Sequence, residues 1–259
     1  MEILSANNPR VKQWVQLLQK KGRDRQGKFL AEGVHLVQEA IRSGFPIECI
    51  VYNKEHGWPN EIKKPGNLEC IAVSPAVLKK CTDAKTPQPV FAVMPKLEWQ
   101  RPHVTDGLFI AVDSIQDPGN LGTIIRSADA AASDGVWIQS GSADIYNPKT
   151  VRASMGSLFH VPVIEENLPE RFTALQQESK TKIVGTLLEA KKTCYDFDFT
   201  GPCCIVIGSE GSGISEQVKK SLTDTVKIPM PGQAESLNAA MAASVLLFEA
   251  MRQRRYAKQ

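Results

Sequence analysis

Three glycine-rich, polar stretches of the chain could together hold a small ligand. They span residues 113–120, 208–213 and 229–236, and each follows a short apolar run typical of a β-strand. Parallel sheets bind ligands at the carboxyl ends of their strands, where such stretches converge. The residues alone also leave open a second interpretation, in which the glycines only make tight turns.

The usual nucleotide and hydrolase signatures are absent. The chain has no G-x-x-x-x-G-K-[ST] loop, and Gly208, Gly211 and Gly213 are spaced in the reverse order of the dinucleotide fingerprint. No G-x-S-x-G elbow occurs, and none of the four histidines lies close in sequence to a candidate nucleophile. We therefore do not expect a nicotinamide or flavin cofactor.

The elements that must position the three stretches alternate between strand and helix. We expect strands at residues 108–112, 135–139, 182–187, 203–207 and 226–229. Helical periodicity occurs at residues 121–132, 169–179, 214–222 and 236–254. This alternation predicts a mostly parallel sheet covered by helices.

The first part of the chain predicts a smaller α/β unit. Pro9 after Asn8 favours a basic helix that continues to about Lys21. Further elements are expected as helices at residues 32–43 and 75–80 and strands at residues 47–52, 69–73 and 90–94. Two prolines and several charges in residues 94–106 indicate a linker. The expected domains are residues 1–95 and 107–259, joined by residues 96–106.

The composition is that of a packed globular protein. The 259 residues are 42% hydrophobic and 23% charged, which suits one large domain or two modest ones. Six cysteines show neither zinc-ligand spacing nor a disulfide framework, so free thiols and no metal are expected. The N-terminus lacks the apolar core of a signal peptide and no run is long enough to span a membrane, so we expect a cytoplasmic protein.

The net charge of +3 is unevenly distributed, because basic residues dominate the N-terminal stretch. Only Glu2 and Asp24 oppose the stretch's seven cations, which are Arg10, Lys12, Lys20, Lys21, Arg23, Arg25 and Lys28. Such an arm suits phosphates. A solvated helix face would have the same composition.

Three motifs identify a family. Asp117-Pro-Gly-Asn120-Leu-Gly-Thr-Ile-Ile-Arg126, Gly208-Ser-Glu210-Gly-Ser-Gly213 and Ile228-Pro-Met-Pro-Gly232-Gln-Ala-Glu-Ser236-Leu-Asn238 occur in that order, each after a predicted strand. They resemble the three motifs of the SpoU (TrmH) family in the SPOUT superfamily of RNA methyltransferases. Residues 8–12 and 28–33 resemble the family's N-terminal RNA-binding extension, whose fold is similar to that of certain ribosomal proteins.

This resemblance implies the fold, the cofactor and the partners. The implied fold is a C-terminal SPOUT α/β domain with a deep trefoil knot, which general chain-threading rules would not predict. The implied cofactor is S-adenosylmethionine, and the implied partners are RNA and a second copy of the chain that completes the active site. Ala239 and Ala240 depart from the family pattern, in which a β-branched residue and a serine are frequent; we expect this to alter packing and not chemistry.

The resemblance also assigns candidate site residues. The cofactor set is Gly185, Thr186, Ile207, Gly208, Ile228, Met230 and Leu237, and the catalytic set is Asn120, Arg126, Glu210, Ser236 and Asn238. Asn120 would fix Arg126 or the ribose, Glu210 would order the glycine loop or reach across the dimer, and Ser236 with Asn238 would close the site. Asn120 and Ser236 also stand where helix N-caps would.

Arg126 matches the family arginine proposed as general base for the ribose 2'-hydroxyl. A guanidinium is a poor base at neutral pH, so we favour a role in gripping the adjacent phosphate and stabilising the developing alkoxide. A family segment at residues 147–157 adds Lys149 and Arg152 as candidate RNA contacts, with Ser154 and Gly156 permitting close backbone approach. A surface turn with two solvated charges is the alternative.

The resemblance implies ribose 2'-O-methylation of RNA as the activity. It favours 23S large-subunit rRNA, because an N-terminal extension of this length resembles that of the family's rRNA members more than the shorter arms of its tRNA members. A tRNA substrate is one alternative, and a non-catalytic RNA-binding protein of ribosome assembly is another. A methyltransferase of small molecules or proteins would leave the basic N-terminal arm without a purpose.

Overall fold

The computed structural model describes residues 1–102 and 105–256, so part of the expected linker lies outside the described residues. The chain forms two compact units. The first comprises Met1–Glu98 and Asp144–Phe159, and the second comprises Trp99–Ala143 and His160–Gln259. A separate N-terminal unit is therefore present, and it includes a segment from the middle of the sequence.

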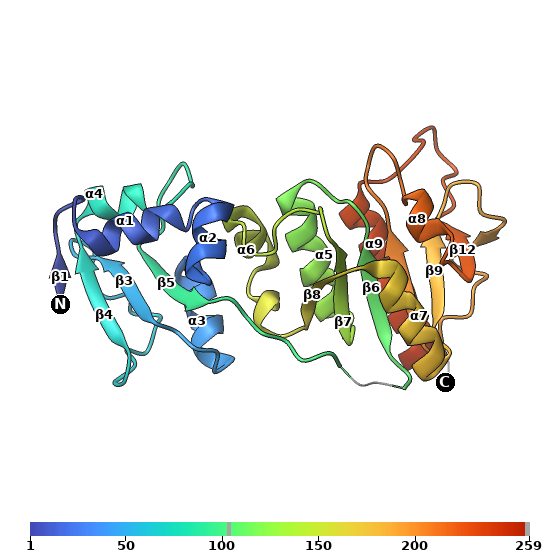
Figure 1. Cartoon of the computed structure of the whole chain (residues 1–259), viewed down its shortest axis with the longest axis horizontal. Helices are drawn as coiled ribbons and strands as arrows, with labels where there is room; N and C mark the ends of the chain where they lie inside the picture. Colours follow the sequence, from blue (N-terminus) through green and yellow to red (C-terminus); the bar gives the residue numbers. More distant parts are fainter. Residues whose placement is uncertain (103–104, 257–259) are drawn as a thin grey trace. The chain divides into compact units, whose positions relative to one another are not determined.

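The first unit is built on a five-stranded sheet (Figure 1). The strand order is β1 (Glu2–Ile3), β4 (Glu69–Val73), β3 (Cys49–Asn53), β5 (Val90–Pro95) and β2 (Lys28–Glu32). Strand β5 runs antiparallel to β3 and β2, and the other pairs are parallel. Its helices are α1 (Pro9–Gln16), α2 (Lys20–Gln26), α3 (Val34–Arg42), α4 (Pro75–Lys80), α6 (Pro148–Ser154) and the 3-10 turn Ser157–Phe159.

The single helix expected from Pro9 to Lys21 is two helices. Asn8 caps α1 as expected, but the chain turns after Gln16 and resumes as α2. A Cβ atom on Gly22 would lie 1.9 Å from the carbonyl oxygen of Gln16. The turn therefore brings α2 so close to the end of α1 that only glycine fits there.

Segment 144–159 covers the edge strand β2. The ring of Tyr146 lies 4.8 Å from that of Phe29, and its hydroxyl bonds the backbone of Leu97 at 2.9 and 3.0 Å. Burial raises the pKa of Tyr146 to about 12, so the hydroxyl stays protonated. The edge of the sheet is thus closed by residues distant in sequence.

The second unit confirms the predicted parallel sheet. All neighbouring strands run parallel, in the order β10-β12-β9-β11-β6-β7-β8. Three predicted strands have the expected bounds, namely β6 (Leu108–Val112), β7 (Gly135–Gln139) and β11 (Cys203–Ile207). Strand β9 spans Lys182–Thr186, β12 spans Asp224–Lys227, and β8 (Val163–Glu166) and β10 (Lys192–Thr193) were not expected.

Helices cover both faces of this sheet. Helix α7 (Leu168–Ser179) and helix α8 (Glu216–Lys219) pack on Phe109, Trp137 and Val206. Helices α5 (Pro118–Ala130) and α9 (Ala239–Tyr256) pack on each other, and α9 also contacts β11. Figure 1 shows α7 in front of the strands and α9 behind them. None of the helices in the described ranges is long and apolar enough to cross a membrane.

Candidate cofactor pocket and catalytic residues

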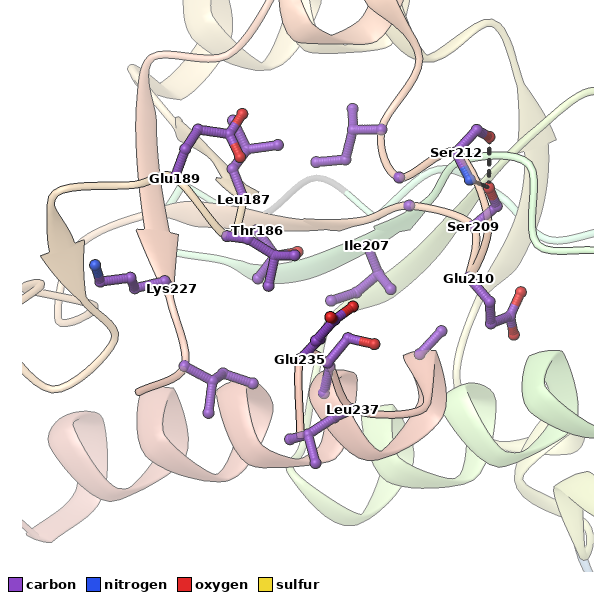
Figure 2. Close-up of a pocket in the computed structure, with 18 of the residues that line it drawn as sticks. Thr186, Leu187, Glu189, Ile207, Ser209, Glu210, Ser212, Lys227, Glu235 and Leu237 are labelled. Atoms are coloured by element: carbon purple, nitrogen blue, oxygen red, sulfur yellow. Dashed lines mark hydrogen bonds between the residues drawn. The ribbon is translucent and has the colours of Figure 1, made fainter. Parts of the chain in front are cut away.

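A pocket of about 470 Å³ lies where β9, β11 and β12 end (Figure 2). It is lined by residues 186–189 after β9, residues 207–214 after β11, and parts of residues 226–242 after β12. Its volume is within the roughly 300–1,000 Å³ of small-molecule sites. The pocket is at the carboxyl edge of the sheet, where such sites are expected.

The structure brings most of the predicted cofactor residues to this pocket. Six of the seven line it, namely Thr186, Ile207, Gly208, Ile228, Met230 and Leu237. Gly185 is buried and is not among the residues that line the pocket, so its assignment to the cofactor site stays a prediction. A Cβ atom on Gly185 would lie 2.4 Å from Cδ1 of Leu222, so the glycine admits that side chain.

Gly208 begins a tightly folded loop. A Cβ atom at this position would fall 2.1 Å from the carbonyl carbon of Gly213 and 2.3 Å from the nitrogen of Ile214. Ser209 and Gly213 exchange two backbone hydrogen bonds of 3.0 Å, and the Ser209 and Ser212 hydroxyls lie 2.7 Å apart (Figure 2). A side chain at position 208 would therefore clash with the backbone at the end of the same loop, so only glycine fits there. The glycines of the loop present their backbone to the pocket.

Asn120, Glu210 and Asn238 join the three motifs. The Asn120 side-chain amide donates to the Glu210 carboxylate, and the Asn238 amide donates to Oδ1 of Asn120 at 3.1 Å. Helix α5, the glycine loop and the start of α9 are thereby tied at one point. This contact brings together three of the five predicted catalytic residues.

Arg126 lies outside this network. It is exposed on α5, does not line the pocket, and forms no hydrogen bond or ion pair with any residue in the described part of the chain. The expected contact between Asn120 and Arg126 is absent there, since Asn120 is bonded to Glu210 and Asn238 instead. The guanidinium is free to meet a substrate.

The helix caps differ from those considered from the sequence. Asp117 caps α5 and accepts from the Asn120 backbone at 2.9 Å, so Asn120 is one turn inside the helix. Asn238 accepts from the backbone of Ala240 at 3.0 Å and Met241 at 3.3 Å at the start of α9. Ser236 is therefore not a cap; it is exposed and lines the pocket.

Charged side chains of both signs line the pocket. Glu189, Glu210 and Glu235 supply carboxylates, and Lys219 and Lys227 supply ammonium groups. S-adenosylmethionine carries a sulfonium, an ammonium and a carboxylate, so this lining and the backbone of the glycine loop fit it. Glu189, Lys219, Lys227 and Glu235 were not predicted, because isolated charges have no spacing that marks them.

The N-terminal cations divide into free and paired groups. Lys12, Lys20 and Lys21 are exposed, and Arg25 is exposed beside Gln16. Arg10 is held by both oxygens of Glu69 at 2.9 and 2.7 Å, which raises the pKa of Arg10 and lowers that of Glu69. Lys28 pairs with Glu48.

Two of the predicted RNA contacts are held in ion pairs within the first unit. Arg23 is 1% exposed and bonds Asp144 through Nε at 3.0 Å and Nη2 at 2.5 Å. Arg152 pairs with Glu32 at 3.2 Å and with Asp83 at 2.6 Å. Buried Arg23 is therefore not available to a phosphate, whereas Arg152 keeps 29% of its side chain exposed and stays a predicted RNA contact. Lys149, in the same segment as Arg152, is exposed.

No group of His, Cys, Asp and Glu side chains that could hold a metal ion occurs in residues 1–102 and 105–256. The six cysteines are free thiols, and five of them are buried.

Comparison with known proteins identifies both parts of the chain. The sequence model of the SpoU rRNA Methylase family matches residues 107–248, and that of the MRM3-like substrate binding domain matches residues 8–92. The chain is 36% identical to the 23S rRNA (guanosine(2553)-2'-O)-methyltransferase RlmP of Bacillus subtilis, over 95% of this chain and 98% of that protein. It is 37% identical to a 23S rRNA (uridine(2479)-2'-O)-methyltransferase of Streptomyces viridochromogenes, over 97% and 92%.

Solved structures agree with these relatives. The SpoU methyltransferase AviRb of Streptomyces viridochromogenes, crystallised with AdoMet, superposes with a TM-score of 0.88 at 34% identity, over 96% of this chain and 99% of that one. A TrmH/SpoU tRNA modifying enzyme of A. aeolicus covers 60% of this chain with a TM-score of 0.51 at 23% identity, which shows a shared fold alone. The family match over more than half of the chain and the full-length relatives show that the chain belongs to the SpoU rRNA methylase family.

Proposed function

We propose that this protein transfers a methyl group from S-adenosylmethionine to a ribose 2'-hydroxyl of large-subunit rRNA. The observation that carries the proposal is the junction of Asn120, Glu210 and Asn238, which brings three separate motifs to the edge of one pocket. Two relatives that align over nearly their full length are named 23S rRNA 2'-O-methyltransferases. The AdoMet complex of AviRb supports the choice of cofactor.

The cofactor, when bound, supplies an electrophilic methyl group. The protein has to hold it, place the 2'-hydroxyl in line with the methyl carbon and assist loss of the hydroxyl proton. Thr186, Ile207, Gly208, Ile228 and Leu237 would enclose the cofactor. Glu210 would order the glycine loop through Asn120, and Ser236 would close the open side.

Arg126 is proposed to act on the RNA. Its exposed guanidinium has no partner within the described residues and can form two charge-assisted hydrogen bonds with a phosphate. In that position it would stabilise negative charge that develops on the ribose oxygen. Lys12, Lys20, Lys21, Arg25 and Lys149 are the exposed cations proposed to meet the RNA backbone.

A homodimer is part of the proposal. Helix α9 exposes Met241 at 55% and Phe248 at 45%, and these residues are seven apart, so they share one helix face. An exposed apolar helix face beside a site indicates that another surface covers it. We also propose the trefoil knot implied by the family and a cytoplasmic location.

Methyl transfer to purified RNA tests the function. The protein is incubated with S-adenosylmethionine that is radiolabelled in its methyl group. Each reaction also contains one RNA, namely 23S rRNA, 16S rRNA or bulk tRNA, purified from cells that lack the protein. We expect label in 23S rRNA, at one nucleotide whose following phosphodiester bond resists alkaline cleavage because its 2'-hydroxyl is methylated. Label in tRNA alone would replace the rRNA proposal, and cofactor-independent RNA binding without methyl transfer would favour an assembly protein.

A further inference from the structure

Asp113 is a carboxylate buried in the methyltransferase unit. It directly follows β6 and its residue exposure is 0%. Oδ1 accepts a hydrogen bond of 3.0 Å from the hydroxyl of Ser114, and Oδ2 accepts one of 2.7 Å from the backbone nitrogen of Ser215. It forms no ion pair with a cation of the described residues. Burial of a carboxylate without a cation lowers stability, and hydrogen bonds to the carboxylate offset part of that cost. The hydrogen bonds of Asp113 are therefore the place to look for its role.

Two of the residues that Asp113 bonds, Ile207 and Ser215, lie at the two ends of the glycine loop. Its backbone nitrogen donates to the carbonyl oxygen of Ile207 at 2.8 Å, directly before Gly208. Its carboxylate holds Ser215, directly after Ile214. All seven residues between these anchors, 208–214, line the cofactor pocket. One residue therefore fixes both the entry and the exit of the loop.

Neighbouring contacts hold Asp113 itself in place. Ser114 adopts φ 62°, a left-handed conformation that costs energy outside glycine. Its backbone nitrogen donates to the Ser142 hydroxyl at 3.1 Å, while its own hydroxyl bonds Asp113. Ser215 in turn caps helix α8, accepting from Val218 at 3.4 Å. Both residues that bond the Asp113 carboxylate, Ser114 and Ser215, are thus held by further hydrogen bonds.

We propose that Asp113 is a positioning residue that holds the 208–214 loop in its cofactor-binding conformation before the cofactor arrives. The sulfonium and the ribose are not contacted by Asp113; the residue acts through the backbone of Ser215. Preorganisation of a binding loop lowers the ordering cost of binding, so loss of the anchor weakens cofactor affinity. This inference rests on the proposed cofactor.

Calorimetric binding of S-adenosylmethionine and of S-adenosylhomocysteine tests the role. For Asp113→Ala we expect Kd to rise by about tenfold or more for both compounds, since a hydrogen bond to a charged group is lost. KM for the donor should rise similarly, while kcat at saturating donor changes by less than about threefold. Asp113→Asn keeps an acceptor for Ser215 and should restore most of the affinity.

Asp134→Ala is the matched control. The Asp134 carboxylate accepts from the backbone of Leu108 at 2.9 Å, at the opposite end of the same strand β6. We expect its thermal stability to fall with no change in cofactor Kd. Asp113→Ala with lowered stability and unchanged Kd would overturn the proposal and leave only a structural role.

A second pair of variants applies if Asp113→Ala does not fold. Ser215 has φ −64°, which proline adopts, so Ser215→Pro removes the N–H that Asp113 accepts. Ser215→Ala loses the same hydroxyl but keeps the N–H. Weaker cofactor binding by the proline variant alone supports the anchor, and equal binding by both contradicts it. Absence of cofactor binding by the wild-type chain would instead refute the proposed cofactor.

Discussion

Individual side chains in the site fall into two classes, those that hold loops and those left free. Asn120, Glu210 and Asn238 bond one another, so their contribution is to fix the relation between α5, the glycine loop and α9. Arg126 is exposed and has no partner within the described residues. Removal of a holding residue should affect cofactor binding, whereas removal of Arg126 should affect the chemical step.

Arg126→Ala tests whether the exposed Arg126 acts in the chemical step. We expect kcat to fall by about 10²–10³-fold, since one preorganised donor to a developing oxyanion is lost. Calorimetric Kd for S-adenosylmethionine should stay within about twofold, because Arg126 does not line the pocket. Arg126→Lys keeps the charge without the planar fork and should recover part of the rate. Full activity of the alanine variant would remove Arg126 from the mechanism.

Asn120→Ala tests whether the contacts of Asn120 with Glu210 and Asn238 support cofactor binding. The Glu210 carboxylate loses its donor and Asn238 loses its acceptor, so the glycine loop is less ordered. We expect cofactor Kd to rise by about fivefold to tenfold. Thr123→Ala, one turn along α5 with its hydroxyl bonded to Gly119, is the control. A selective loss of kcat with unchanged Kd would instead place Asn120 on the ribose.

At the scale of elements, Arg254 supplies several of the hydrogen bonds that hold the end of α9. Arg254 donates to the carbonyl oxygens of Phe199 at 2.9 Å, Asp106 at 3.1 Å, and Gly107 and Gly201 at 3.2 and 2.5 Å. Arg254→Ala removes a donor from each of these carbonyls, of which, within the described residues, only that of Gly107 keeps a second one, from the Cys203 backbone. The variant should reduce the free energy of unfolding by about 2 kcal/mol. Urea denaturation measures this, with the exposed Arg255→Ala expected within about 0.5 kcal/mol of wild type.

Helices α1 and α2 carry the exposed cations that we expect to bind RNA, which are Lys12, Lys20, Lys21 and Arg25. Lys20→Gln with Lys21→Gln should weaken RNA binding and lower the slope of log K against log salt by about 0.7–0.9 for each phosphate that is no longer neutralised. Filter binding at several salt concentrations measures both. Lys28→Gln is the control, because Lys28 is already paired with Glu48. An unchanged slope in the double variant would place RNA on another surface.

Much of this element structure could be predicted from the sequence. Apolar runs bounded by polar residues predicted β6, β7 and β11, Pro9 after Asn8 marked the start of α1, and the helix predicted at residues 75–80 is α4. The return between α1 and α2 could not be predicted, since it depends on Gly22 lying against Gln16. Long-range pairs were equally hidden, because nothing in the local sequence distinguishes Arg23 from the exposed lysines beside it.

At the scale of the whole molecule, the chain enters the first unit twice. It leaves after Glu98, returns at Asp144 and leaves again after Phe159. Segment 144–159 closes the β2 edge, supplies the partner of buried Arg23 and places Arg152 between Glu32 and Asp83. A unit that ends at residue 95 therefore lacks part of its own interior, and a truncation there is expected to be unstable.

Asp144→Ala tests this division of the chain. Removal of Asp144 leaves Arg23 buried without its carboxylate, which should cost about 3–5 kcal/mol. Exposed Asp83→Ala also removes an acid facing this segment but should cost less than about 1 kcal/mol. Hydrogen exchange should accelerate in residues 1–98 and 144–159, while strands β6 and β11 and the cofactor Kd stay unchanged. If exchange accelerated in residues 107–142 and 160–256 instead, the segment would belong to the methyltransferase unit, since the loss of one buried partner loosens the core that contains it.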